Sequence, residues 1–184
     1  MKILLASGSP RRKQILEERG HEVTVVRPVF DESQIRIEEP AALVAALAEG
    51  KGKSVACPKE MLLVASDTVV VLDGKVLGKP ADEADAFAML RAMSGRTHEV
   101  FTGVYLQYRG KAVRFTDRAE VLFRDLTDRE ILAYIATGSP MDKAGSYGVQ
   151  DSGFVETING SYYTVMGFPI ERFTEISMEL EKGI

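Results

Sequence analysis

The sequence is poor in the residues that build disulfide frameworks and zinc sites. It contains one cysteine, two histidines and no tryptophan. A lone Cys57 excludes an internal disulfide, and we interpret it as a small buried side chain in a reducing compartment. His21 and His98 lie far apart in the sequence, so structural or surface roles are expected for both. A metal is therefore expected among oxygen ligands, which favours Mg²⁺ or Mn²⁺.

A positive charge excess and long apolar runs are missing as well. Lys and Arg total 23 against 27 Asp and Glu, which gives a net charge of −4. This balance argues against a protein that covers a nucleic-acid backbone, but it allows a small nucleotide. No apolar run approaches the roughly 20 residues of a membrane span, and the apolar run in the start MKILLASGSP is too short for the apolar region of a signal peptide. We expect a cytoplasmic protein without nucleic-acid or membrane partners.

Two familiar nucleotide motifs are also absent. Neither GxxxxGK[ST] nor GxGxxG occurs, so P-loop, kinase and Rossmann dinucleotide interpretations lose support. Apolar runs bounded by turns alternate with helical patterns instead, which is typical of an α/β chain. A length of 184 residues suits one domain, taken as 1–184, with two lobes.

The turn residues predict a mixed sheet. Asp73-Gly74 indicates one hairpin, and the turn at 108–111 joins two long strands in another. Gly50 and Gly52 weaken the helix expected from Pro40, because each costs about 1 kcal/mol against alanine. Strands are expected at 3–6, 21–26, 61–65, 69–72, 75–77, 99–107 and 112–123; helices at 10–19, 40–55, 83–93, 128–135 and 170–180; and irregular structure at 141–169.

The segment KILLASGSPRRK at 2–13 indicates an anion site. A strand is followed by a turn of small residues with free backbone N–H groups, and Ser9 can cap a helix that begins with Pro10. Arg11 and Arg12 fall in the positive first turn of that helix, where cations are locally unfavourable. A bound phosphate would reverse the penalty. A solvated basic helix start explains the same residues equally well.

Asp67, in VASDTVVV, is the strongest candidate for chemistry. Its apolar neighbours predict burial, and a buried carboxylate needs a partner, a proton or a cation. A strand-end aspartate that accepts backbone hydrogen bonds is an equally good interpretation. Lys79 follows the hairpin that begins beside Asp67, so we expect Lys79 to lie near Asp67. Lys51 and the Asp31-Glu32 pair are weaker candidates.

Six blocks in order resemble the Maf proteins, which are nucleoside triphosphate pyrophosphatases once described as septum-formation inhibitors. The blocks are LLASGSPRRK at 4–13, SDTVV at 66–70, LGKP at 77–80, SGRTHEVFTGV at 94–104, PMDKAGSYGVQ at 140–150 and INGSYYTVMGFP at 158–169. The resemblance is collinear from residue 4 to about 170. It departs at Gly50 and Gly52, where relatives have better helix formers, and at Ser146, where alanine is frequent.

The resemblance implies an elongated α/β fold similar to the inosine-triphosphate pyrophosphatases, with two lobes, a central cleft and often a homodimer. It also implies a reaction in which water attacks the α-phosphate of a nucleoside triphosphate, with a divalent cation, and releases a monophosphate and pyrophosphate. The family's proton acceptor matches Asp67, which could instead hold the metal. Asp31 matches an acidic position that is a second metal contact.

The family's phosphate-binding positions match Ser7, Arg12, Lys51 and Lys79. Three further positions carry substrate choice. The branch that cleaves dTTP and UTP has arginine, threonine and glutamine there, which match Arg11, Thr68 and Gln150, whereas the branch that takes 7-methyl-GTP differs at all three. The resemblance therefore implies a dTTP/UTP pyrophosphatase that cleanses the nucleotide pool.

Two other functions remain open at this point. One is a nucleotide-binding regulator of cell division whose catalysis is incidental, although the acid and the cations together argue against it. The other is an enzyme of the same fold that removes inosine or xanthosine triphosphate, against which Arg11, Thr68 and Gln150 speak.

Overall fold

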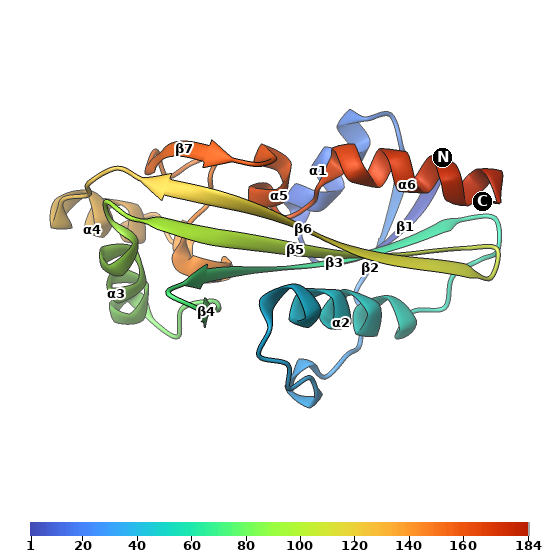
Figure 1. Cartoon of the computed structure of the whole chain (residues 1–184), viewed down its shortest axis with the longest axis horizontal. Helices are drawn as coiled ribbons and strands as arrows, with labels where there is room; N and C mark the ends of the chain where they lie inside the picture. The colour runs from blue at the N-terminus through green and yellow to red at the C-terminus, as the bar shows by residue number, and fades with distance from the viewer. Residues whose placement is uncertain (184) are drawn as a thin grey trace. The chain divides into compact units, whose positions relative to one another are not determined.

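The computed structural model describes residues 1–183, which form a seven-stranded mixed sheet and its covering helices (Figure 1). The strands are β1 Lys2–Ala6, β2 Glu22–Val26, β3 Leu62–Leu72, β4 Lys75–Leu77, β5 Thr97–Tyr108, β6 Lys111–Phe123 and β7 Val155–Asn159. The α-helices are α1 Pro10–Glu18, α2 Pro40–Lys53, α3 Glu83–Met93, α4 Asp128–Ala136, α5 Tyr162–Met166 and α6 Ile170–Lys182. Short 3₁₀ turns are η1 Glu32–Gln34, η2 Ser139–Asp142 and η3 Ala144–Ser146. The predicted α/β class is confirmed.

The sheet order is β2-β1-β3-β5-β6-β7, with β4 paired to β3. β1 runs parallel to β2 and to β3, while β4 and β7 pair antiparallel with β3 and β6. Both predicted hairpin turns are confirmed. Asp73-Gly74 and Arg109-Gly110 each place two successive residues at positive φ, the conformation of a type I′ turn that matches the strand twist.

The chain divides into two compact units. Unit 1 comprises Met1–Asp67, Thr102–Asp117 and the chain from Gly167 onward, and unit 2 comprises Thr68–Phe101 and Arg118–Met166. Each of the strands β3, β5 and β6 therefore contributes residues to both units.

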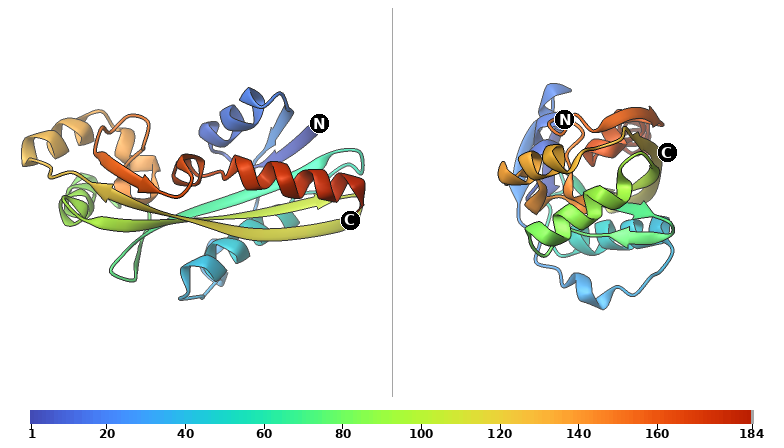
Figure 2. Two further views of the ribbon diagram at one scale, coloured as in Figure 1. Left: turned by 45° about the horizontal axis from the view of Figure 1, so that its top comes forward. Right: turned by 90° about the vertical axis from the view of Figure 1, so that its left-hand side faces the viewer.

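In unit 1, helices cover both faces of the sheet. Figures 1 and 2 show α2 on one face and α1 with α6 on the other. Helix α2 lies directly on β5, because a Cβ built on Gly103 would meet the Val44 carbonyl oxygen and would lie 2.7 Å from the Ala45 nitrogen. Tyr105 and Ala48 belong to the buried cluster under α2.

In unit 2, α3 and α4 pack with the sheet around aromatic rings. Buried His98 stacks edge-on against Phe123 at 4.8 Å between ring centroids, and its Nε2 lies 2.7 Å from the Tyr147 hydroxyl. Burial lowers the pKa of His98 to about 4, so the ring is neutral at pH 7. The expectation of a structural role for this histidine is confirmed.

Three sequence-based expectations need correction. β3 is one continuous strand rather than two, so Asp67 lies in its middle. The helix expected from Pro40 is confirmed, since α2 continues through Gly50 and Gly52 to Lys53 because tertiary packing outweighs helix propensity there. Cys57, expected to be buried, is only partly buried. The segment 141–169, expected to be irregular, contains β7, whose pairing with β6 supplies its backbone hydrogen bonds, and the short helix α5. None of the helices within residues 1–183 is long and apolar enough to cross a membrane.

Candidate functional site

The candidate site in unit 1 lies where the parallel strands β1 and β3 are neighbours. Their register places the turn after β1 beside the part of β3 that contains Asp67. Ala6 at the end of β1 pairs in register with both Val26 and Ala65. Ser7 therefore leaves β1 at the level where Asp67 follows along β3. Crevices outside the carboxyl ends of parallel strands are the usual ligand sites of open α/β sheets.

The turn after β1 is more closed than its sequence suggests. The Ser7 N–H donates to the Val26 carbonyl, and the Ser9 N–H donates to Ser7 Oγ, both at 3.1 Å. The expectation that the turn leaves these N–H groups free is therefore wrong. Ser9 occupies the N-cap position before Pro10, as predicted, but its side chain makes no capping hydrogen bond. The turn instead aims Ser7 Oγ at a side chain of helix α1.

That side chain is Arg12, which folds back over the turn. Its Nε donates to the Gly167 carbonyl at 2.9 Å, and one terminal nitrogen donates to Ser7 Oγ at 3.2 Å. Ser66 Oγ donates to the same Gly167 carbonyl at 3.2 Å. Burial lowers the pKa of the Arg12 guanidinium, while the charge of Asp67 opposes that shift. The desolvated cation thus stands in the field of the candidate acid.

Lys51 joins two carboxylates. Its ammonium lies 2.6 Å from Asp67 Oδ2 and 2.9 Å from Glu32 Oε1, and we call these three residues the Lys51 cluster. The side chains of Lys51 and Asp67 are 16% and 14% exposed, whereas that of Glu32 is 56% exposed. Asp67 is thus a mid-strand carboxylate paired with a lysine, rather than a strand-end cap. The paired charges offset the cost of burying each one alone.

Asp31 makes local contacts instead. Its carboxylate accepts hydrogen bonds from the backbone N–H and the hydroxyl of Ser33, at 3.1 and 2.7 Å, and from Gln34 at 3.4 Å. The hydrogen bonds from Ser33 lower the pKa of the exposed Asp31 carboxyl. Asp31 therefore begins the η1 turn, and Glu32 is the acid of this pair that reaches Lys51.

The remaining predicted residues divide between the units. Arg11 is half-buried in the first turn of α1, whereas Lys79 and Gln150 are exposed and lie in unit 2 with Thr68. The loop before Gln150 contacts the segment before Lys79, because the Gly145 N–H donates to the Gly78 carbonyl at 3.1 Å.

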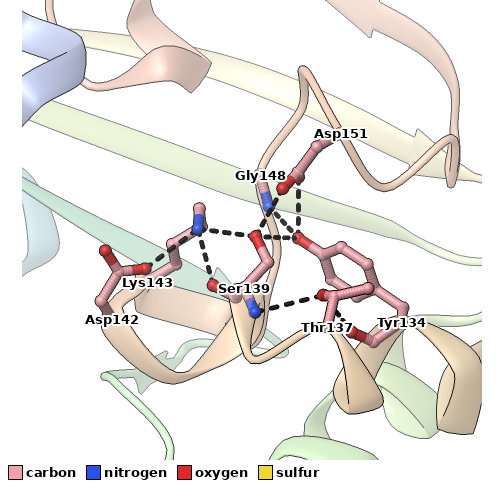
Figure 3. Close-up of polar contacts among 7 residues, drawn as sticks. All are labelled: Tyr134, Thr137, Ser139, Asp142, Lys143, Gly148 and Asp151. Atoms are coloured by element: carbon pink, nitrogen blue, oxygen red, sulfur yellow. Dashed lines mark hydrogen bonds and ion pairs between the residues drawn. The ribbon is translucent and has the colours of Figure 1, made fainter.

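A separate network organises that loop in unit 2 (Figure 3). The Tyr134 hydroxyl donates to Asp151 Oδ1 at 2.9 Å and accepts from the Gly148 N–H at 3.0 Å. Ser139 Oγ donates to Asp151, and Lys143 Nζ donates to the carbonyl and the hydroxyl of Ser139 at 2.6 and 2.9 Å. We call Tyr134, Ser139, Lys143, Gly148 and Asp151 the Ser139 network.

No group of three or more His, Cys, Asp or Glu side chains suited to a metal occurs within residues 1–183. The Lys51 cluster nevertheless offers two carboxylates held on one ammonium. Mg²⁺ is commonly bound through one or two carboxylates together with substrate phosphates. The donor set therefore fits a divalent cation whose remaining ligands come from outside the protein.

The sequence interpretation gave little weight to Glu32 and did not single out Gly167. Glu32 is adjacent to the residue chosen for metal contact, and nothing local distinguishes the two carboxylates. Gly167 carried a signal, since a glycine before Phe168-Pro169 suggests an unusual backbone, and its φ is 103°. Its carbonyl receives both Arg12 and Ser66.

Comparison with solved structures supports the fold. A HAM1 protein from Coxiella burnetii matches with a TM-score of 0.51 and 14% identity, over 97% of this chain and 99% of that one. The Staphylococcus aureus Ham1 protein matches with a TM-score of 0.53 and 13% identity, over 96% and 100%. At these identities the likeness concerns the fold alone, which is similar to that of the Ham1 proteins.

More similar relatives match 93–99% of the chain. The dTTP/UTP pyrophosphatase of Bacillus cytotoxicus is 46% identical over 185 residues, which cover 99% of this chain and 97% of that protein. A Bacillus cereus protein of the same name is 45% identical over 174 residues, or 93% and 91%. The family model of the Maf-like proteins matches residues 2–180. The chain therefore belongs to the Maf family.

Proposed function

We propose that the protein is a nucleoside triphosphate pyrophosphatase that hydrolyses dTTP and UTP to the monophosphate and pyrophosphate. The observation that carries the proposal is the Lys51 cluster, in which a half-buried lysine lies 2.6 Å from the mid-strand carboxylate of Asp67, next to a desolvated arginine. The names of the relatives at 45–46% identity support the same reaction and the same substrates.

In the proposed mechanism, Asp67 is the base. Its carboxylate takes a proton from water as the water oxygen attacks the α-phosphorus, and the bond from the α-phosphorus to the bridging oxygen breaks. Pyrophosphate leaves with the electron pair. A positioned base contributes roughly 10²–10⁴-fold to such a reaction.

The cations have the complementary role. Arg12 and Lys51 would contact the triphosphate together with Ser7, and Lys79 would join them. Fixed positive charge near the leaving pyrophosphate stabilises the charge that develops in the transition state. Arg12 suits this role because its guanidinium is held in a fixed orientation by the Gly167 carbonyl.

A divalent cation, Mg²⁺ or Mn²⁺, would be held by Glu32, joined by Asp67 in the alternative in which Asp67 is a metal ligand instead of the base, and when bound it would neutralise phosphate charge. Lys51 now balances both carboxylates, so it would become available to the phosphates once the carboxylates hold the metal. Asp31 stays in the proposal as the second metal contact implied by the family resemblance, and exchanging Asp31 and Glu32 separately for asparagine and glutamine distinguishes the two acids.

Base choice is assigned to Arg11, Thr68 and Gln150 on the family resemblance. We further propose a homodimer in the cytoplasm. The proposed substrates are abundant small nucleotides, so no nucleic acid or membrane partner is needed.

The test is an activity panel on the purified protein. dTTP, UTP, dCTP, ITP, XTP and 7-methyl-GTP are supplied with Mg²⁺ or Mn²⁺, and both pyrophosphate and orthophosphate are measured. The proposal expects pyrophosphate from dTTP and UTP above all others. Orthophosphate alone or no turnover would refute the reaction, and a preference for ITP or XTP would refute the pyrimidine assignment. Should Asp67→Asn abolish hydrolysis yet leave a cell-division phenotype intact, regulation would be the primary role.

A further inference from the structure

The last turn of helix α2 reads Gly50-Lys51-Gly52, and neither glycine has the positive φ that would require it. Two glycines in a helix interior are unfavourable for the helix itself. Since the backbone conformation is ordinary, the reason for both must lie in the space around them.

Two aromatic rings fill that space. A Cβ built on Gly50 would lie 2.5 and 2.6 Å from Cε2 and Cε1 of Phe30, with Cζ closer still. A Cβ on Gly52 would lie 2.8 Å from Cε1 and 3.3 Å from Cγ of Tyr105. Each ring therefore packs on a bare Cα, at a distance that a side chain would permit only if the ring shifted.

These two contacts bracket Lys51. Tyr105 comes from β5 in the core of unit 1, so its ring holds the Gly52 side of the helix end against the sheet. Phe30 comes from the segment after β2, so its ring ties that segment to the Gly50 side. Glu32 follows Phe30 by two residues, and its carboxylate lies 2.9 Å from the Lys51 ammonium.

We propose that the ring contacts Phe30 on Gly50 and Tyr105 on Gly52 position Lys51 and Glu32 for the reaction at Asp67. The two rings and the two glycines that they contact are positioning residues, and the inference rests on the proposed pyrophosphatase function. A displacement of about 1 Å at a reacting group can cost about 10²-fold in rate. Contacts that fix the position of Lys51 therefore affect the rate directly.

The first experiment is a double-mutant cycle between Gly50 and Phe30. Gly50→Ala is expected to lower kcat/KM for dTTP about 10- to 100-fold, since its methyl group displaces the ring. In a Phe30→Ala background the methyl group has room, so Gly50→Ala is expected to change kcat/KM less than about twofold. An equal loss in both backgrounds, or no loss in the wild type, would overturn the proposal.

The second cycle asks whether Phe30 acts through Lys51. Phe30→Ala is expected to lower kcat/KM about 10- to 100-fold in the wild type, but less than about twofold when Lys51 is already alanine. A purely structural role would lower both by the same factor, which would contradict the proposal. Val29→Ala is the matched control, because Val29 is adjacent and 88% exposed, and it is expected to leave kcat/KM unchanged.

A crystal structure of Phe30→Ala provides a readout that does not depend on activity. The expected result is that the Glu32 carboxylate and the Lys51 ammonium move beyond 4.0 Å, the limit for an ion pair. Both ion pairs at their present distances would overturn the positioning role even in an active enzyme. An inactive wild-type protein whose variant loses the ion pair would instead refute the pyrophosphatase and leave the positioning intact.

Discussion

The Lys51 cluster in unit 1 and the Ser139 network in unit 2 are both polar, but they differ in whether their contacts suit exchange with a ligand. In the Lys51 cluster, one ammonium balances two carboxylates, and in the function that we propose a metal would bind the carboxylates while a phosphate would bind the ammonium. In the Ser139 network, the Tyr134 hydroxyl of α4 and the Asp151 carboxylate connect the turns at Ser139 and Gly148, and donors are paired with acceptors of unit 2 itself. The first arrangement suits exchange with a ligand, and the second holds a loop in shape.

The largest expected effect is a loss of kcat in a variant of Asp67, which is compared with the same change at Asp151. Asp67→Asn removes the proposed base and is expected to reduce kcat by roughly 10²–10⁴-fold with the fold retained. Asp151→Asn is the matched change in unit 2, and it is expected to lower the free energy of unfolding by about 1–3 kcal/mol with a much smaller effect on kcat. Rates and urea unfolding of both variants would be measured, and equal rate losses would erase the proposed difference.

The next effect concerns stability alone. Burial lowers the pKa of His98 to about 4, whereas an unfolded histidine titrates near 6.5. Between these values the unfolded chain binds a proton that the folded chain does not, so the free energy of unfolding falls as pH falls, by about 3 kcal/mol in all. The loss begins near pH 6.5 and is complete below about pH 4.

Urea unfolding from pH 7 to 3.5 would measure this loss for the wild type and for His98→Gln. The difference between the two curves isolates the histidine from the carboxylates that titrate in the same range. A variant as sensitive to acid as the wild type would show that His98 is not the group responsible.

Arg12→Lys tests whether the arginine close to the Lys51 cluster binds the triphosphate. Lysine keeps the charge but cannot hold the Gly167 carbonyl and Ser7 Oγ in the same plane. We expect kcat/KM to fall about 10- to 100-fold for every triphosphate alike, from one or two charge-assisted hydrogen bonds. Arg109→Lys, at the exposed hairpin turn, is the control for the same exchange. A change in base preference without a general loss would argue that Arg12 reads the base.

The smallest expected effect is that of Tyr134→Phe. Burial raises the pKa of Tyr134 to about 12, so its hydroxyl stays protonated and can donate to Asp151. Without the hydroxyl the Gly148 N–H loses its acceptor, at a cost of about 1–3 kcal/mol. Because Gln150 lies between Gly148 and Asp151, discrimination between UTP and ITP should weaken while kcat for UTP is retained.

Tyr162→Phe, at a tyrosine that is 42% exposed, is the control for this exchange. Both proteins would be assayed with UTP and ITP and unfolded in urea. A Tyr134→Phe protein with unchanged stability and unchanged discrimination would show that the Ser139 network does not hold the loop.

Local chemistry determined much of this protein from the sequence alone. The Asp73-Gly74 and Arg109-Gly110 turns specify their own hairpins, because the glycine of each pair adopts positive φ without a steric cost. The anion-site interpretation of SGSPRRK correctly placed Pro10 at the start of a helix, since proline's fixed φ suits that position. Asp67 was found by its apolar neighbours, which predict burial from sequence alone.

Only the tertiary structure decided which groups meet. Lys51 and Asp67 are 16 residues apart, and Arg12 and Gly167 are 155 apart, so no local pattern specifies either contact. Glu32 rather than Asp31 reaches Lys51 because the η1 turn uses the Asp31 carboxylate. Gly50 and Gly52 reduce helix propensity, yet the helix continues because rings from distant segments occupy the space where side chains would stand. Propensity acts between neighbours in sequence, whereas packing acts between neighbours in space, and in this chain packing sets the geometry of the candidate site.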